Sequence, residues 1–329
     1  MPTYSQDPEL FQVQAAKETT FGTLGTAVTP TIKLVDTTKC DIKPLMKAEA
    51  RKYLRGSLAP TYRHVLKEIG AQASVESDVS YDDICYWLET LFAIATPSGT
   101  GPYVRAYSAP LTAIVSAARQ MTLVKGNADG TWKLTSGIGT KIVLKGNNTG
   151  PWTVSIEMFG YDVTIGTLAA LSDRSTTLAL GSDTSIALDA WAGTIGATVL
   201  TGVQFDFELT IDTKRTPKRH MTLKPDSLNQ PEWSTQLKLS LEYNATSHAY
   251  LTSLLTQTAQ ALYQKQVRIK ATDGTNIVQL DFAGTADDVP IPTEQNGVMT
   301  IDLILDGEYC AALGNYLAAS VSNSVAILA

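Results

Sequence analysis

The side chains best suited to metal or nucleophilic chemistry are scattered through this 329-residue sequence. Its histidines and cysteines are His64, His220, His248, Cys40, Cys85 and Cys310. No histidine has a cysteine or carboxylate at a metal-ligand spacing such as His-Glu-x-x-His, and no Cys-x-x-Cys pair occurs. Neither a metal site nor a disulfide framework is expected, and the cysteines are predicted to be isolated buried thiols.

Motifs for nucleotide or carbohydrate chemistry are also lacking. No P-loop, Gly-x-Ser-x-Gly elbow or Gly-x-Gly-x-x-Gly appears, and Gly137-Ile-Gly139 lies between predicted strands, where it indicates a bend rather than a phosphate site. Carboxylates on the strands could form a glycosidase pair, which needs two acids facing one cleft. They recur instead along polar strand faces, where single acids are ordinary. We therefore predict a non-enzymatic protein without a cofactor.

The composition is that of a folded protein rather than a typical nucleic-acid binder. Hydrophobic residues make up 44% of the chain, enough to build a core. The net charge is −6, whereas proteins that bind nucleic acid are usually basic, with clustered Lys and Arg that neutralise phosphates. The N-terminus lacks the basic and apolar regions of a signal peptide. No apolar run approaches the roughly 18–20 residues of a membrane helix. We expect a protein that is soluble when made, with no membrane partner.

Strand periodicity is clearest in the second half. Apolar and polar side chains alternate over residues 203–212, which predicts a half-buried strand with an acidic outer face. Residues 237–243 repeat the pattern. A helix is predicted over 244–257, with Thr246 or Ser247 as its N-cap. Further strands are predicted at 267–271, 277–283 and 298–305.

The first half follows the same order of elements. A strand, a basic arm, an alternating strand, a helix and three strands are predicted at 32–43, 44–70, 71–80, 81–93, 121–125, 138–145 and 153–159. Ser80 and Asp83 give the helix a capping-box-like start. In both halves an Asp-Gly turn separates the first two of the last three strands. The shared order predicts an internal duplication.

The duplication sets the expected domain boundaries. A first domain is predicted at 1–165 and a second at 202–329, joined by a Ser/Thr/Ala/Gly-rich connection at 166–201 that could add a strand or helix of its own. Residues 94–116 are predicted to be a loop that the second copy lacks. The expected fold is mainly β with flanking helices, as two tandem sandwich or barrel domains, each with one packed helix and a long hairpin arm.

Both halves separate basic arms from acidic strand faces. The candidate arm contacts are Lys47, Arg51, Lys52, Arg55, Lys214, Arg215, Lys218 and Arg219. The candidate acidic residues of a lumen or outer wall are Glu76, Asp78, Asp206, Glu208 and Asp212. A solvated loop beside a solvated sheet would explain this pattern in a monomer, and a phosphate-binding arm is an alternative. Its repetition favours complementary surfaces between copies of the chain.

The sequence resembles the tail tube (major tail) proteins of long-tailed bacteriophages. The resemblance lies in the opening Gln14-Ala-Ala-Lys-Glu-Thr-Thr-Phe-Gly-Thr23, an arm with Gly56 and Gly70, and a capped helix with Trp87 and Leu88. It covers the first 95 residues best, and most of the remainder through the repeat.

Several expectations follow from this resemblance. Such proteins form rings that stack into a hollow tube, in which strands of neighbouring domains make a continuous inner barrel and long loops bridge the rings. Duplicated members form rings of three chains with pseudo-sixfold symmetry, which we expect here. The implied partners are further copies, other tail proteins at the tube ends, and double-stranded DNA that passes without specific binding. The implied location is the virion tail, assembled in the host cytoplasm.

Two rival functions fit parts of the pattern. One is another β-rich virion or secretion-tube component, such as a capsid decoration protein or tube ring. The other is a carbohydrate-binding β-sandwich. Under the tail tube hypothesis, changing Lys214, Arg215, Lys218 and Arg219 to Glu is expected to weaken ring stacking more than monomer folding.

Overall fold

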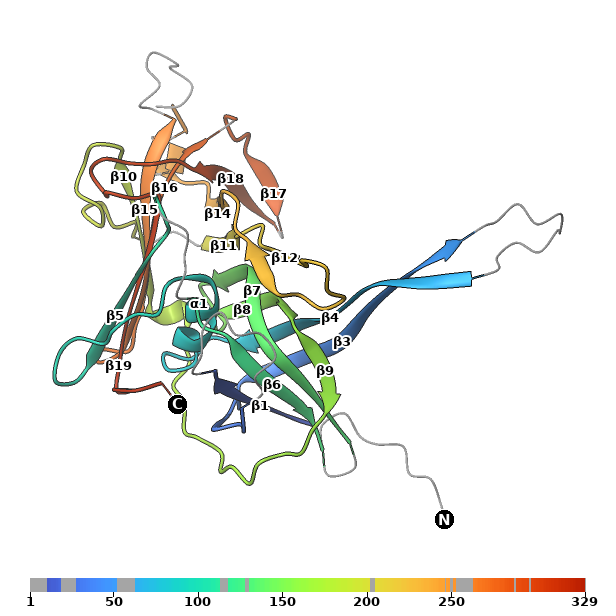
Figure 1. The fold of residues 1–329 in the computed structure, drawn as a ribbon. Coiled ribbons are helices and arrows are strands. Elements are labelled where there is room, and N and C mark those ends of the chain that lie inside the picture. Colours follow the sequence, from blue (N-terminus) through green and yellow to red (C-terminus); the bar gives the residue numbers. More distant parts are fainter. Residues whose placement is uncertain are drawn as a thin grey trace.

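The computed structural model describes residues 11–18, 28–51, 63–112, 118–127, 130–201, 205–245, 247–248, 251–252, 263–286, 288–295 and 297–328. Most of these residues lie in β-strands, and the helix α1 (Ile84–Leu91) packs among them (Figure 1). The predicted mainly β architecture with a flanking helix is confirmed.

One antiparallel sheet runs through both halves of the chain, and we call it the shared sheet. Its strands, in spatial order, are β3 (Thr37–Arg51), β4 (Arg63–Asp78), β8 (Thr153–Gly160), β7 (Thr131–Asn147), β11 (Phe205–Asp212), β14 (Ser234–Glu242) and β18 (Val298–Gly307). β17 (Thr293–Gln295) pairs with the edge of β18 that faces away from β14. The halves meet where β7 pairs with β11. In this antiparallel pair, Lys141 lies opposite Asp212 and Asn147 lies opposite Asp206.

Each half adds a second sheet behind the shared one. In the first half, β2 (Ile32–Lys33), β1 (Gln12–Lys17), β6 (Met121–Gly126), the start of β7 and β9 (Asp162–Ile165) lie side by side. In the second, the order is β10 (Thr184–Ala190), β15 (Gln264–Thr272), β16 (Ile277–Ala286), β19 (Leu317–Asn323) and β5 (Tyr103–Ser108). The chain thus builds two sandwiches that share one sheet.

Five of these strands, β1, β5, β9, β10 and β19, lie where none was assigned from the sequence. β5 falls in the predicted loop 94–116 and leaves its own half to extend the sheet of the other, so the loop prediction is wrong there. β10 falls in the predicted connection, which the sequence left open to a strand. The last three strands predicted in each half are confirmed as β6, β7 and β8 in the first half and β15, β16 and β18 in the second. Each of them extends beyond its predicted bounds.

The strand β7 belongs to both sheets because it bends at Gly137 and Gly139, as the sequence indicated. A Cβ atom on Gly139 would lie 2.3 Å from Leu91 Cδ1, so only glycine lets α1 approach this closely. Next to the bend, Ser136 has a left-handed φ of 51°. The buried Glu18 carboxylate fixes this residue by accepting hydrogen bonds from its backbone N–H at 2.6 Å and its hydroxyl at 2.8 Å.

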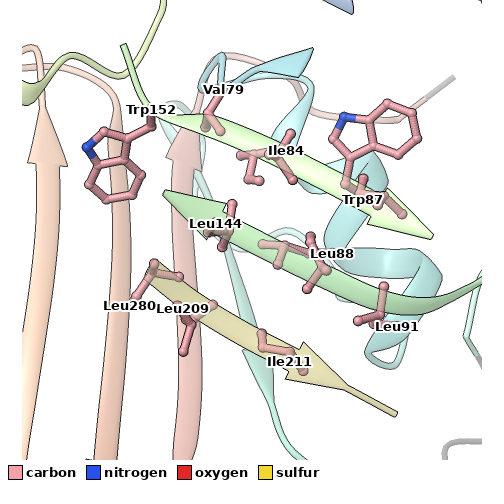
Figure 2. Close-up of a cluster of buried hydrophobic side chains, with 14 of the residues drawn as sticks. Val79, Ile84, Trp87, Leu88, Leu91, Leu144, Trp152, Leu209, Ile211 and Leu280 are labelled. Atoms are coloured by element: carbon pink, nitrogen blue, oxygen red, sulfur yellow. The ribbon is translucent and has the colours of Figure 1, made fainter. Parts of the chain in front are cut away.

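The helix α1 fills the space between the sheets. Figure 2 shows Leu88 and Leu91 of α1 among Leu144, Leu209 and Ile211 of β7 and β11, all of them buried. The helix is shorter than the predicted 81–93, because residues 81–83 form a turn and Phe92 is extended.

Both predicted helices are preceded by a polar side chain that accepts the backbone N–H three residues later, although Asp83, directly before α1, makes no side-chain cap bond itself. Ser80 Oγ accepts the backbone N–H of Asp83 at 3.2 Å, as the capping pattern predicted. In the second half, residues 245, 247, 248, 251 and 252 are helical. There Asn244 Oδ1 accepts the backbone N–H of Ser247 at 3.2 Å, so the prediction of Ser247 as cap is wrong, and Thr246 lies outside the described residues.

The predicted arms are hairpins of different kinds. The predicted strand 32–43 and arm 44–70 become β2 and a long ladder in which β3 and β4 pair out to Arg51 and Arg63, projecting beyond the body of the protein (Figure 1). The strand predicted at 71–80 therefore begins eight residues earlier, at Arg63. The second arm contains a separate two-stranded sheet of β12 (Thr216–Lys218) and β13 (Ser227–Asn229).

Leu209→Ala tests the junction between the halves. Leu209 is fully buried opposite Leu144, so we expect the free energy of unfolding to fall by about 2–5 kcal/mol in urea titrations. Ile304→Ala in β18, where the side chain is 45% exposed, should change it by about 0.5 kcal/mol or less. Equal effects of the two substitutions would contradict a stabilising junction.

Candidate assembly surfaces

The exposed side of the shared sheet carries a net excess of acid, and we call it the polar face. Its outward positions follow from the register of the strands, since buried and exposed side chains alternate along each one. Its charged residues are Lys39, Asp41, Lys43, Glu76, Asp78, Lys141, Lys145, Glu157, Asp206, Glu208, Asp212, Lys238, Glu242, Asp302 and Asp306. Carboxylates outnumber lysines, so the field above this face is negative at neutral pH.

The five acidic residues singled out from the sequence all lie on the polar face. Glu76 and Asp78 come from β4, and Asp206, Glu208 and Asp212 from β11, so two segments far apart in sequence contribute to one surface. Asp78 differs from the others because burial and the nearby Asp36 carboxylate raise its pKa.

Ion pairs join adjacent strands across the polar face. Lys39 Nζ lies 3.0 Å from Glu76 Oε1, and Lys145 Nζ lies 2.9 Å from Glu208 Oε2 across the junction of the two halves. Lys238 Nζ lies 2.8 Å from Asp302 Oδ2. Exposed pairs of this kind contribute roughly 0–1 kcal/mol each. They order the surface and leave the excess carboxylates to set its sign.

The hairpin of β3 and β4 neutralises part of its own positive charge. Lys47 Nζ lies 3.0 Å from Glu68 Oε2, and Arg51 Nη1 lies 3.1 Å from Glu49 Oε1. Lys67 pairs with the same Glu49 carboxylate. Lys47 and Arg51 remain largely exposed, whereas the predicted contacts Lys52 and Arg55 lie outside the described residues.

Arg215, predicted to be an arm contact, is instead an internal anchor. It is 3% exposed, and its guanidinium donates to the carbonyl oxygens of Thr90 at 2.9 Å, Leu91 at 2.5 Å and Gly139 at 3.3 Å. Thr90 and Leu91 end α1, where unpaired carbonyls attract a cation. Burial lowers the pKa of Arg215 to about 10, so it remains charged at neutral pH. It is unavailable to a neighbouring molecule.

Arg219 likewise turns inward and helps to fasten the second arm to the first. Its guanidinium donates to the carbonyl oxygens of Leu223 at 3.2 Å and Ile69 at 3.4 Å. The backbone N–H of Ile69 also donates to the carbonyl oxygen of Leu223, at 2.9 Å. Nearby, the side chain of Lys224 forms an ion pair with Asp162 of β9. Of the four basic residues predicted in this arm, Lys214 and Lys218 are exposed.

The metal-ligating and thiol side chains of the described residues are dispersed. No group of three or more His, Cys, Asp or Glu side chains that could hold a metal ion occurs within the described ranges. The three cysteines are free and buried, as predicted, and burial raises the pKa of Cys40 and Cys85 to about 12, which disfavours the reactive thiolate. In this part of the chain, no helix is long and apolar enough to cross a membrane.

Comparison with known protein families gives a match over most of the chain. The family model described as phage tail tube protein matches residues 12–309. No curated protein matches the sequence significantly.

Arg215→Met tests the anchor. The substitution keeps an apolar stem and removes the donors to three buried carbonyls, so we expect the free energy of unfolding to fall by about 2–3 kcal/mol. The matched control Lys214→Met changes an exposed neighbour and should leave the urea midpoint nearly unchanged. Unaltered stability of Arg215→Met would show that Arg215 is not an anchor.

Proposed function

This chain belongs to the phage tail tube protein family, and on that premise we propose that its copies form stacked rings that build the hollow tail tube. In this role it is a structural virion protein with no catalytic site. Double-stranded DNA passes through the tube into the host, and other tail proteins bind the tube ends. The rings assemble in the host cytoplasm.

The pairing of the two halves supports an internal duplication. β1 pairs with β6 as β10 pairs with β15, and β4 pairs with β8 as β14 pairs with β18. β7 contacts β6, β8 and β9, as β16 contacts β15, β18 and β19. Ser80 Oγ and Asn244 Oδ1 each accept a hydrogen bond from the backbone N–H three residues later in the chain. The second unit then begins near β10, earlier than residue 202, and the first ends with β9 near residue 165.

The junction of β7 and β11 is the observation that carries the ring proposal. It already joins two equivalent units edge to edge within one chain. The paired residues run from Lys141 opposite Asp212 to Asn147 opposite Asp206. A strand edge is a template for another strand, and a ring is the arrangement that leaves no edge open. Three chains of two units each give pseudo-sixfold symmetry.

The polar face suits the lumen of such a tube. DNA carries a dense negative charge along its backbone, and the excess carboxylates of the polar face repel it. Glu76, Asp206 and Glu208 would face the passing duplex, and the lysine partners of Glu76 and Glu208 limit the repulsion. DNA therefore moves along the lumen without binding to a specific site.

The arms are suited to contacts between rings. The hairpin of β3 and β4 projects beyond the body (Figure 1). Lys47 and Arg51 are largely exposed on it. Lys214 and Lys218 are the exposed bases of the second arm. Lys52 and Arg55, which lie outside the described residues, remain candidates from the sequence, and the inward Arg215 and Arg219 are excluded.

Negative-stain microscopy and mass photometry over a protein concentration series test the ring proposal. We expect rings with the mass of three chains, or hollow tubes of one diameter. Rings of six chains would keep the tube and contradict the pseudo-sixfold arrangement. A protein that stays monomeric over the whole series would contradict self-assembly of this chain.

The double variant Lys214→Glu and Lys218→Glu tests the second arm. We expect isolated rings to persist and tubes to shorten or vanish, because both lysines are exposed and neither holds the fold. The control variant Lys133→Glu with Lys270→Glu makes the same change of charge on the two sheets that lie behind the shared sheet. It should leave the tubes intact. Tubes of normal length in the arm variant would exclude these lysines from stacking.

A further inference from the structure

A cavity of about 500 Å³ lies at one end of the second unit, and we call it the end pocket. Gly307 at the end of β18 and Thr235 at the start of β14 line it. Trp233, Tyr309 and Tyr316 supply its aromatic side chains, and that of Tyr309 is 55% exposed. A partly apolar cavity of this volume is typical of binding sites.

The register of the shared sheet identifies the corresponding place in the first unit. Gln72 lies opposite Phe159 in the first unit, as Gln236 lies opposite Asp306 in the second. Each glutamine also lies eight residues before the polar side chain that precedes the helix of its unit. A residue near the start of the sheet-forming part of β4 therefore corresponds to the residue 164 positions later in the second unit.

In the first unit this place is occupied by the second arm. Pro225 is buried there, and its Cγ lies 3.9 Å from where a Cβ atom on Gly70 would be. The Arg219 guanidinium donates to the carbonyl oxygen of Ile69 at 3.4 Å and lies 4.0 Å from a carboxylate oxygen of Glu68. A segment with an arginine and a proline thus covers the end of the first unit.

The corresponding place of the second unit lacks this cover. Ser234 is exposed, whereas its counterpart Gly70 is buried. Glu232, the counterpart of Glu68, lines the end pocket, and no cation of the described ranges pairs with it. Burial and then the Glu232 carboxylate raise the pKa of Tyr316 to about 12, so this carboxylate acts on the wall of the end pocket. A carboxylate is available where the first unit holds an arginine.

The first arm carries the same pattern of residues as the second. The second arm reads Arg219-His-Met-Thr-Leu-Lys-Pro225, and the first reads Arg55-Gly-Ser-Leu-Ala-Pro60. Both place Leu-x-Pro three or four residues after an arginine. The two prolines are equally far from the shared sheet once Lys67, the extra residue of the β-bulge in β4, is allowed for. Residues 52–62 fall outside the described residues, so this match is one of sequence.

We propose that the end pocket binds the Arg55–Pro60 segment of the neighbouring copy in the ring. Pro60 lies among the aromatic rings, and the Arg55 guanidinium pairs with Glu232. The ladder of β3 and β4 that carries this segment projects beyond the body, where another copy can reach its tip (Figure 1). The contact rests on the proposed ring but uses neither open edge of the shared sheet. It gives the first arm a binding site on the next chain, as the second arm has one within its own.

The chemistry of the end pocket suits this segment. Proline-containing segments dock on aromatic side chains, since their extended conformation is restricted before binding. An arginine and a carboxylate form a strong, directional pair. Leu111, 48% exposed at the end pocket, offers apolar surface to Leu58. The combination of arginine and proline distinguishes the arm from other extended chains.

Exchange of the two charges tests the pairing. Arg55→Glu and Glu232→Lys are each expected to raise the protein concentration needed for rings roughly tenfold, because like charges then meet. The double variant restores opposite charges and should form rings at the wild-type concentration. Asp183→Lys, the same change at an exposed carboxylate before β10, is the control for Glu232→Lys and should assemble as the wild type does.

Two results of the charge exchange would overturn the proposal. One is ring formation by both single variants at the wild-type concentration. The other is a double variant that assembles no better than the single variants. Glu232→Lys should keep the wild-type melting temperature as a monomer, since Glu232 is exposed, so a loss of rings is not a loss of folding.

A cysteine pair tests the position of the segment. In the double variant Ala59→Cys and Tyr309→Cys, rings treated with a short bis-maleimide should yield cross-linked trimers on denaturing gels. A mixture of the two single variants should yield linked pairs of chains, because the contact is between copies. Rings of the double variant that give no cross-link, or a link within one chain, would overturn the inference alone. Absence of wild-type rings would overturn the proposed function and the inference with it.

Discussion

The pairing of β7 with β11 is the constraint on which the rest of the structure depends. It converts two sandwiches into one body by giving them a common sheet. β7 can serve this purpose because it is 17 residues long and bends where Gly137 and Gly139 allow α1 to approach. A straight strand would belong to one sheet only, and the halves would then meet through side chains alone.

Arg215 connects the bend, the helix and the second half in one contact. Its guanidinium binds carbonyls at the end of α1 and at Gly139, both in the first half, while its backbone follows β11. Directly after it, the second arm lies on the base of the projecting hairpin through Arg219 and Leu223. The direction of the hairpin is therefore set by contacts with the second half.

Alternation of apolar and polar residues predicted most of the shared sheet, since half-buried strands with one solvated face leave that pattern in the sequence. The same pattern placed the acidic residues of β4 and β11 on one face. It did not reveal β1, β5, β9, β10 or β19. β5 and β10, for example, are short, and their partners, β19 and β15, lie far along the chain. The burial of Arg215 was also hidden, because a run with Lys214, Lys218 and Arg219 is typical of a solvated loop. Only the unpaired carbonyls at the end of α1 explain why one cation of that run turns inward.

The open edges of the shared sheet pose the opposite problem from its internal junction. Within the chain, β7 and β11 are held together at high effective concentration, so a complete ladder forms without competition. Between chains, an equally regular edge would pair with any extended strand. Pro44 lies in β3, and Pro290 and Pro292 precede β17; none of the three has an N–H to donate, so pairing with unrelated strands is weakened at these edges. The chain thus combines complete backbone pairing inside the folded unit with prolines that limit backbone pairing at its open edges.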